Sequence, residues 1–109
     1  MMTITIPDKY VETLRTLGNV DAAVSLAVQR YTIEQITTKI NTLRQKTDHY
    51  QARYGMDYPA FYERLADEEF VTQLEADGYT TWEIDQADWE FCHEGIQDWT
   101  ATLQRILLS

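Results

Sequence analysis

The residues best suited to chemistry stand near the C-terminal end of the chain, where Glu90 and His93 form a Glu-x-x-His pair around Cys92. On a helix this spacing places both side chains on one face, as di-iron carboxylate bundles require. Such sites also need further Glu ligands and a second pair, and His49 has no Glu three residues before it. Cys92 and His93 are adjacent, so on a helix they point about 100° apart and do not form a nucleophile with its base. We therefore predict no catalytic residue, no metal site, no cofactor and no enzyme.

Aromatic and acidic side chains are the second feature with chemical meaning, because Trp and Tyr anchor protein interfaces. At helical spacing such aromatic residues are more typical of a core. Trp89 and Trp99, on one stripe of the last predicted helix, are expected to be internal. The residues expected to contact a partner are Tyr58, Phe61, Tyr62, Asp85, Asp88 and Glu94.

Negative charge is concentrated in the second part of the chain. The whole chain has a net charge of -9. Residues 1–40 contain four basic and four acidic residues, whereas the rest of the chain contains five basic and fourteen acidic ones. An acidic surface is poorly suited to a phosphate backbone and favours a basic protein partner. The alternative interpretation is a solvated acidic surface that keeps the protein soluble.

Length and composition are those of an ordinary soluble chain. At 109 residues and 44% hydrophobic, there is room for one domain. No run of about 18 apolar residues is present, so no membrane span is expected. The N-terminus lacks the basic and apolar regions of a signal peptide, and the single cysteine forms no internal disulfide. We expect a cytoplasmic protein.

Helical periodicity predicts the elements that position these side chains. One helix is expected over residues 8–17, with Gly18 as its stop, and a second from Val20 to Tyr54 without an internal Gly or Pro. From Ile33 onward the apolar residues of the second helix follow a heptad. A heptad stripe indicates packing along a partner helix, supplied by a second chain or by the C-terminal region.

Two further helical segments are expected in the second half of the chain. One begins near Pro59, bends after residue 66 and continues to about residue 74. The other opens with a capping box formed by Thr80 and Glu83, and its apolar stripe includes Cys92 as a small core residue. The predicted fold class is therefore mainly α.

The stretch from Thr3 to Ile6 differs from the rest, because Thr and Ile alternate as in a β-strand. A single strand leaves its backbone groups unpaired unless a second copy of the chain lies beside it. In such an antiparallel pair Ile4 and Ile6 face a core, while Thr3 and Thr5 point outward. We therefore predict an obligate homodimer held by this strand.

The stretch "TITIPDKYVETLRTLGNVDAAVSLAVQRY" resembles the N-terminal module of ribbon-helix-helix antitoxins and repressors. The resemblance covers roughly residues 2–31. It implies a strand paired across a dimer, followed here by a long helix and further C-terminal helices. In that family the paired ribbon enters the DNA major groove.

The resemblance also implies residues that would contact operator DNA. Thr3 and Thr5 would face the bases, and the turn at Gly18 and Asn19 would hold a phosphate through free backbone N–H groups. The nearby positive charges are Lys9 and Arg15. DNA-reading ribbons usually carry Arg, Lys, Asn or Gln at outward positions, and this chain has Thr there. A ribbon that only holds the dimer together therefore remains an alternative.

These observations predict two regions with different tasks. Residues 1–54 would form the dimerisation module, and residues 55–109 an acidic, aromatic region that binds a partner. The segments "YGMDYPAFYERL" and "WEIDQADWEFCHEGIQDW" resemble the tails of small prokaryotic antitoxins. The expected function is an antitoxin that neutralises a basic toxin and regulates its own operator. The alternative is a dimeric scaffold or adaptor with a ribbon-helix-helix-like fold that binds no DNA.

Overall fold

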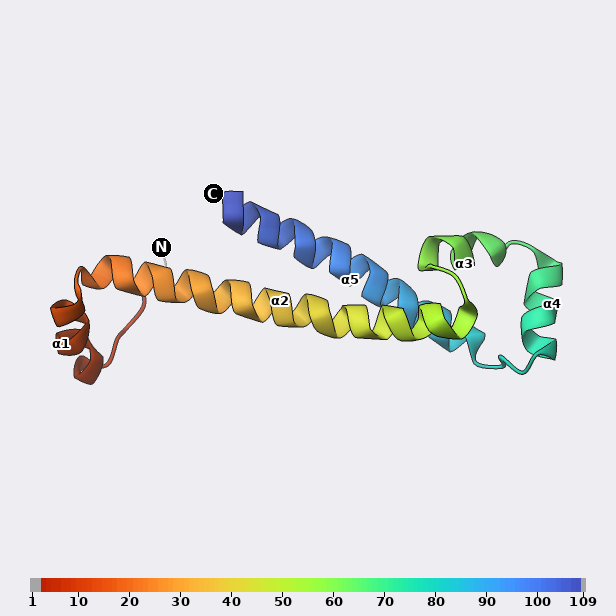
Figure 1. Cartoon of the computed structure of the whole chain (residues 1–109), viewed down its shortest axis with the longest axis horizontal. Coiled ribbons are helices and arrows are strands. Elements are labelled where there is room, and N and C mark those ends of the chain that lie inside the picture. The colour runs from red at the N-terminus through yellow and green to blue at the C-terminus, as the bar shows by residue number, and fades with distance from the viewer. Residues whose placement is uncertain (1–2, 109) are drawn as a thin grey trace. The chain divides into compact units, whose positions relative to one another are not determined.

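The computed structural model describes residues 3–108 and contains only helices within that range. The helices are α1 (Asp8–Leu17), α2 (Val20–Tyr54), α3 (Tyr58–Arg64), α4 (Glu68–Ala76) and α5 (Trp82–Leu108) (Figure 1). The prediction of a mainly α chain is therefore confirmed. None of these described helices is both long and apolar enough to cross a lipid bilayer.

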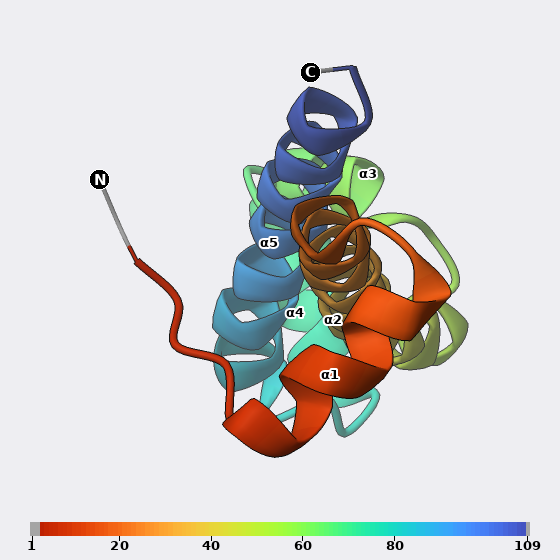
Figure 2. The same cartoon turned by 90° about the vertical axis from the view of Figure 1, so that its left-hand side faces the viewer.

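The predicted ribbon is wrong, and with it the assignment of a ribbon-helix-helix module. Residues 3–7 have no regular secondary structure and lead into α1 as an extended trace (Figure 2). A β-strand is held by hydrogen bonds to a neighbouring strand, and residues 3–108 contain no second strand. Ile4, predicted to face a core, is 58% exposed. Alternation of side chains over four residues is therefore insufficient to form a strand here.

The first two helices begin and end at the predicted residues. Gly18 ends α1 with a φ of 142°, a value that residues other than glycine rarely adopt. Its N–H donates a hydrogen bond to the Arg15 carbonyl. Asn19 then caps α2, because its Oδ1 accepts a hydrogen bond of 3.1 Å from the backbone N–H of Ala22. The Gly-Asn pair therefore separates two helices as the sequence predicts.

The segment predicted to bend after residue 66 consists of two separate helices. Asp57 caps α3 by accepting a hydrogen bond of 3.0 Å from the backbone N–H of Ala60. Asp67 caps α4 in the same way, through the backbone N–H of Glu69 at 3.0 Å. An aspartate that accepts a hydrogen bond from a free N–H group at the start of a helix favours two separate helices and not one bent helix.

The chain divides into two compact units, unit 1 (Met1–Gln35) and unit 2 (Ile36–Ser109), and the boundary lies within α2. These units are defined by packing. The division of tasks between residues 1–54 and 55–109 concerns function and stays a prediction.

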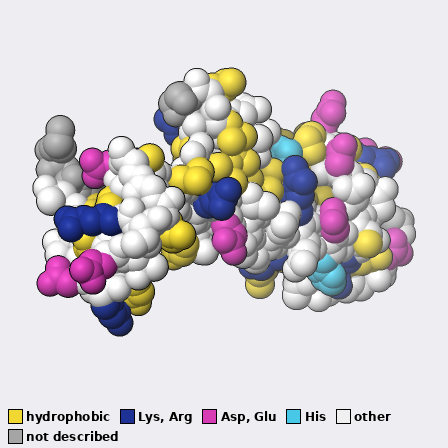
Figure 3. Space-filling model, turned by 60° about the vertical axis from the view of Figure 1, so that its left-hand side comes forward, with side chains coloured by type: hydrophobic (Ala, Val, Ile, Leu, Met, Phe, Trp, Pro, Cys, Tyr) yellow, Lys and Arg dark blue, Asp and Glu magenta, His cyan; other side chains and the backbone are white. Residues whose placement is uncertain are grey.

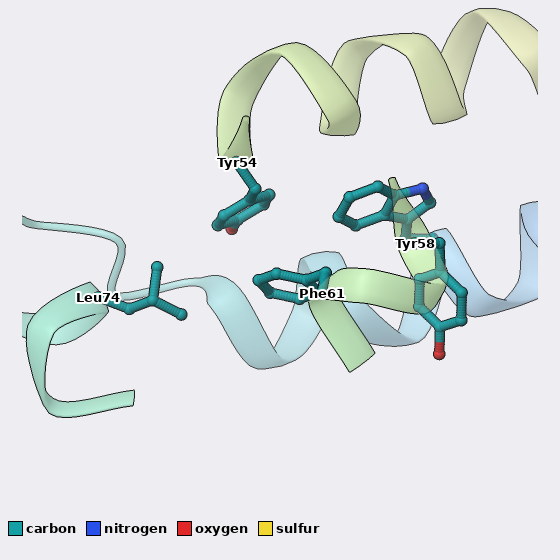
Figure 4. Packing of buried hydrophobic residues seen from close by; sticks show 5 residues of the cluster. Tyr54, Tyr58, Phe61 and Leu74 are labelled. Atoms are coloured by element: carbon teal, nitrogen blue, oxygen red, sulfur yellow. The ribbon is translucent and has the colours of Figure 1, made fainter. Parts of the chain in front are cut away.

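An aromatic cluster forms the core of unit 2. Phe61 and Trp89 are almost fully buried, at 0% and 1% exposed, with their ring centroids 5.2 Å apart. Tyr54, Tyr58 and Leu74 complete the cluster, so α2, α3, α4 and α5 all contribute to it (Figure 4). Each large ring removed from water stabilises such a core by roughly 1.5–3 kcal/mol.

Within unit 2, α5 packs against the part of α2 from Leu43 to Tyr54. Ile36, Ile40 and Leu43 are buried on α2. The two helices approach closely at Gly95, where an added Cβ atom would lie 2.9 Å from Cδ1 of Leu43. Of the two partners that the heptad left open, the C-terminal region therefore packs against this part of α2.

Candidate functional site

Two of the residues predicted to contact a partner belong to the core of unit 2. Phe61 is 0% exposed and Tyr58 is 8% exposed. The Tyr58 hydroxyl accepts a hydrogen bond of 3.0 Å from Nε2 of Gln86, and its ring packs against Trp89 at 5.5 Å. Both side chains therefore position α3 against α5 and leave little surface for a partner.

Asp85 and Asp88, also predicted as contact residues, hold α5 to α2. The hydroxyl of Tyr54 donates to Oδ2 of Asp85, and the hydroxyl of Tyr50 donates to Oδ2 of Asp88, each at 2.6 Å. Arg53 lies 3.3 Å from Asp85, so this carboxylate has two partners from α2. We call these two tyrosine–aspartate pairs the tyrosine–aspartate seam.

The seam shifts the acidity of its tyrosines. Burial, followed by the hydrogen bond to Asp85, raises the pKa of Tyr54 from 10.0 to about 12. The hydrogen bond to Asp88, followed by burial, raises the pKa of Tyr50. In both pairs the neutral phenol is stabilised, because the carboxylate accepts a hydrogen bond from its hydroxyl and would repel a phenolate. The seam therefore keeps the phenols of Tyr50 and Tyr54 protonated.

The remaining predicted contact residues, Tyr62 and Glu94, are at the surface. Tyr62 is 59% exposed, and its ring centroid lies 6.0 Å from that of Tyr58. Burial raises the pKa of Tyr58, and the negative charges of Glu90 and Glu94 act in the same direction. The exposed Tyr62 and these two glutamates therefore lie around the same core tyrosine and form an acidic aromatic surface of α3 and α5.

Sequence reasoning missed the outward face of α5. Ile84 and Phe91 are 71% and 68% exposed, with the exposed Ala87 between them in sequence. On a helix these three residues share a face because they are separated by three and four positions. The buried stripe predicted for this helix could have identified this face, because Phe91 follows Trp89 by two residues and on a helix points away from it. We call Ile84, Ala87 and Phe91 the outer strip of α5.

The structure places Cys92 in the interior of unit 2 and His93 against a core tyrosine. Cys92 is fully buried, and burial raises the pKa of its thiol. The His93 ring packs against Tyr58 with centroids 5.1 Å apart. Within residues 3–108, no three His, Cys, Asp or Glu side chains gather where they could bind a metal ion.

The residues predicted to contact DNA lie in unit 1. Thr3, Thr5 and Arg15 are exposed. Lys9 lies with its Nζ 5.0 Å from the centre of the Tyr10 ring. Gly18 and Asn19 form the turn described above. Thr3 and Thr5 lie outside any strand, so DNA contact by these residues stays a prediction that no paired ribbon supports.

Unit 1 instead has an open apolar groove of about 320 Å³. It is lined by Ile6, Tyr10, Thr13, Leu14, Ala23, Val24, Ala27 and Val28. Ile6, predicted to face a dimer core, is thus on an apolar surface although no strand forms. No side chain among residues 3–35 is buried.

No protein-family model, curated protein or solved structure matches the chain.

Proposed function

We propose that this chain is a dimeric adaptor whose unit 2 captures a basic protein partner. The observation that carries the proposal is the separation of charge between the units. Unit 1 has three basic and four acidic residues, whereas unit 2 has six basic and fourteen acidic ones. Opposite charge on a partner speeds its association and excludes acidic competitors.

Most of the acidic residues of unit 2 form no ion pair with another residue that the structure describes. Among residues 3–108, only Asp85 and Asp88 form ion pairs, through Arg53 and Lys46. Other acidic side chains project from the surface, as Figure 3 shows for one face. Mutual repulsion of these charges costs the free protein stability, and a cationic partner relieves that repulsion.

The homodimer predicted from the sequence is part of the same proposal, with a different interface. Units shorter than about 40 residues rarely fold without disulfides, metals or oligomerisation. Unit 1 has 35 residues, lacks a buried side chain among those described, and presents the apolar groove. A second copy is the proposed occupant of that groove, because unit 1 is almost neutral and two such surfaces repel each other little.

Neutralisation of a basic toxin is a narrower form of this function and stays a prediction. Operator binding also stays untested, and it no longer has a ribbon to support it. The adaptor interpretation is favoured by that missing ribbon and by the small excess of acidic over basic residues in unit 1.

Affinity capture with the full chain, from the cytoplasm of the source cell, tests the proposal in two stages. The captured protein is identified, purified and titrated against the wild type and two matched variants. Glu63→Gln with Glu94→Gln removes two exposed charges from unit 2, and Glu12→Gln with Glu34→Gln removes two from unit 1.

The proposal expects a basic captured protein and weaker binding, by roughly threefold to tenfold at low salt, for the unit 2 variant alone. An acidic partner contradicts the proposal. Equal weakening by both variants also contradicts it, because the site would then not belong to unit 2.

A further inference from the structure

The outer strip of α5 is an apolar surface that stays largely exposed within the part of the chain that the structure describes. Ile84 and Phe91 are each about two-thirds or more exposed, at 71% and 68%. The opposite face of the same helix contains Trp89 and Cys92, which are buried in unit 2. The helix therefore needs only its inner face for folding, and its outer face is free to bind another molecule.

Acidic residues flank this strip on the same helix. Glu83, Glu94 and Asp98 are all exposed on α5. At 100° per residue they lie on the outward half of the helix with Ile84 and Phe91. A second copy of the chain is a poor occupant, because two such strips would bring these carboxylates face to face. The complementary surface has apolar side chains in the middle and positive charges beside them.

We propose that the outer strip of α5 is the docking site for a basic amphipathic helix of the partner. The inference rests on the proposed capture of a basic protein and names the surface and the structural class that it recognises. Two apolar side chains of the partner helix would cover Ile84 and Phe91, while its Lys and Arg side chains would pair with the flanking carboxylates. Apolar anchors inside a polar rim are the usual arrangement of such interfaces.

The test uses two synthetic peptides of identical Leu and Lys composition. One has its leucines at helical spacing, and the other has the same residues in scrambled order. Each is titrated against the full-length wild type, against Ile84→Ser with Phe91→Ser, and against the control Tyr31→Ser. Tyr31 is a matched control because it is 65% exposed and lies in unit 1. Circular dichroism verifies that each variant keeps its helical content.

We expect the wild type to bind the helical peptide roughly tenfold more tightly than the scrambled one. The Ile84→Ser, Phe91→Ser variant should lose that preference, while Tyr31→Ser should keep it. If both peptides bind the wild type equally, the outer strip is not the docking site, although capture of basic partners stands. If neither peptide binds at low salt, the proposed function itself fails.

Discussion

The tyrosine–aspartate seam can be tested by removing one oxygen atom. Tyr54→Phe deletes the hydroxyl that donates to Asp85 at 2.6 Å and keeps the aromatic ring. That ring is 8% exposed and packs against Phe61, with centroids 4.6 Å apart, and against Trp89. The change therefore reports the hydrogen bond and leaves the packing of the core intact.

The expected loss follows from the partners that remain. A hydrogen bond to a charged group contributes about 1.5–3 kcal/mol to the free energy of unfolding. Asp85 keeps Arg53 at 3.3 Å, so its carboxylate is not left without a partner. We therefore expect a loss near the lower limit, about 1.5 kcal/mol, for Tyr54→Phe.

Urea unfolding followed by tryptophan fluorescence measures this loss, because all three tryptophans belong to unit 2. Tyr62→Phe is the matched control, since Tyr62 is 59% exposed on α3 and should change stability by less than about 0.5 kcal/mol. A Tyr54→Phe protein as stable as the control would refute the role given to the seam.

The same pair of proteins gives a pH test with a defined sign. The pKa of Tyr54 is raised from 10.0 to about 12 in the folded chain, so folding favours its neutral phenol. This contribution is fully present below pH 10 and is lost as the pH rises toward 12. Wild type should therefore lose more stability than Tyr54→Phe over that interval. Tyr50 adds a change of the same sign in both proteins.

Three further substitutions test the core, the helix contact and the dimer. Phe61→Ala, at a fully buried position, should cost about 3–5 kcal/mol in the same urea experiment, and a cost below about 1 kcal/mol would contradict the assigned core. Gly95→Leu should lower the free energy of unfolding by about 1–3 kcal/mol, because the larger side chain overpacks the contact with α2. The control Ala101→Leu, at an exposed position of the same helix, should be nearly neutral. Val24→Asp in the groove of unit 1 should convert the dimer to a monomer in sedimentation equilibrium, whereas the control Gln29→Asp, at an exposed position, should not. A wild type that is monomeric at all concentrations would exclude the dimer.

Helix boundaries were predictable from the sequence where one residue determines them. Gly18 and Asn19 end one helix and begin the next by local geometry and a local hydrogen bond. The absence of a strand at residues 3–6 could not be predicted in this way, because a strand depends on hydrogen bonds to a partner strand that the alternation of Thr and Ile does not specify. The break between α3 and α4 had a local signal in Asp67, which was interpreted as a bend.

The site was less predictable because it depends on contacts between distant residues. Asp85 was predicted to face a partner, yet Tyr54, 31 residues earlier, donates to it. A heptad shows which face of α2 is apolar but does not show that a tyrosine hydroxyl extends past it to a carboxylate. Phe91 was accessible to sequence reasoning, since it lies opposite Trp89 on a helix, but only the exposed fraction identifies it as uncovered.

The central claim, that acidic unit 2 captures a basic protein, is tested most directly by the association rate with the captured partner at increasing salt. Stopped-flow mixing measures this rate through the tryptophans of unit 2. Screening of charges at about 8–10 Å in physiological salt should slow association at least roughly tenfold between dilute buffer and about 0.5 M NaCl. The Glu63→Gln, Glu94→Gln variant should start slower and converge with wild type at high salt. An association rate that does not change with salt would contradict the claim.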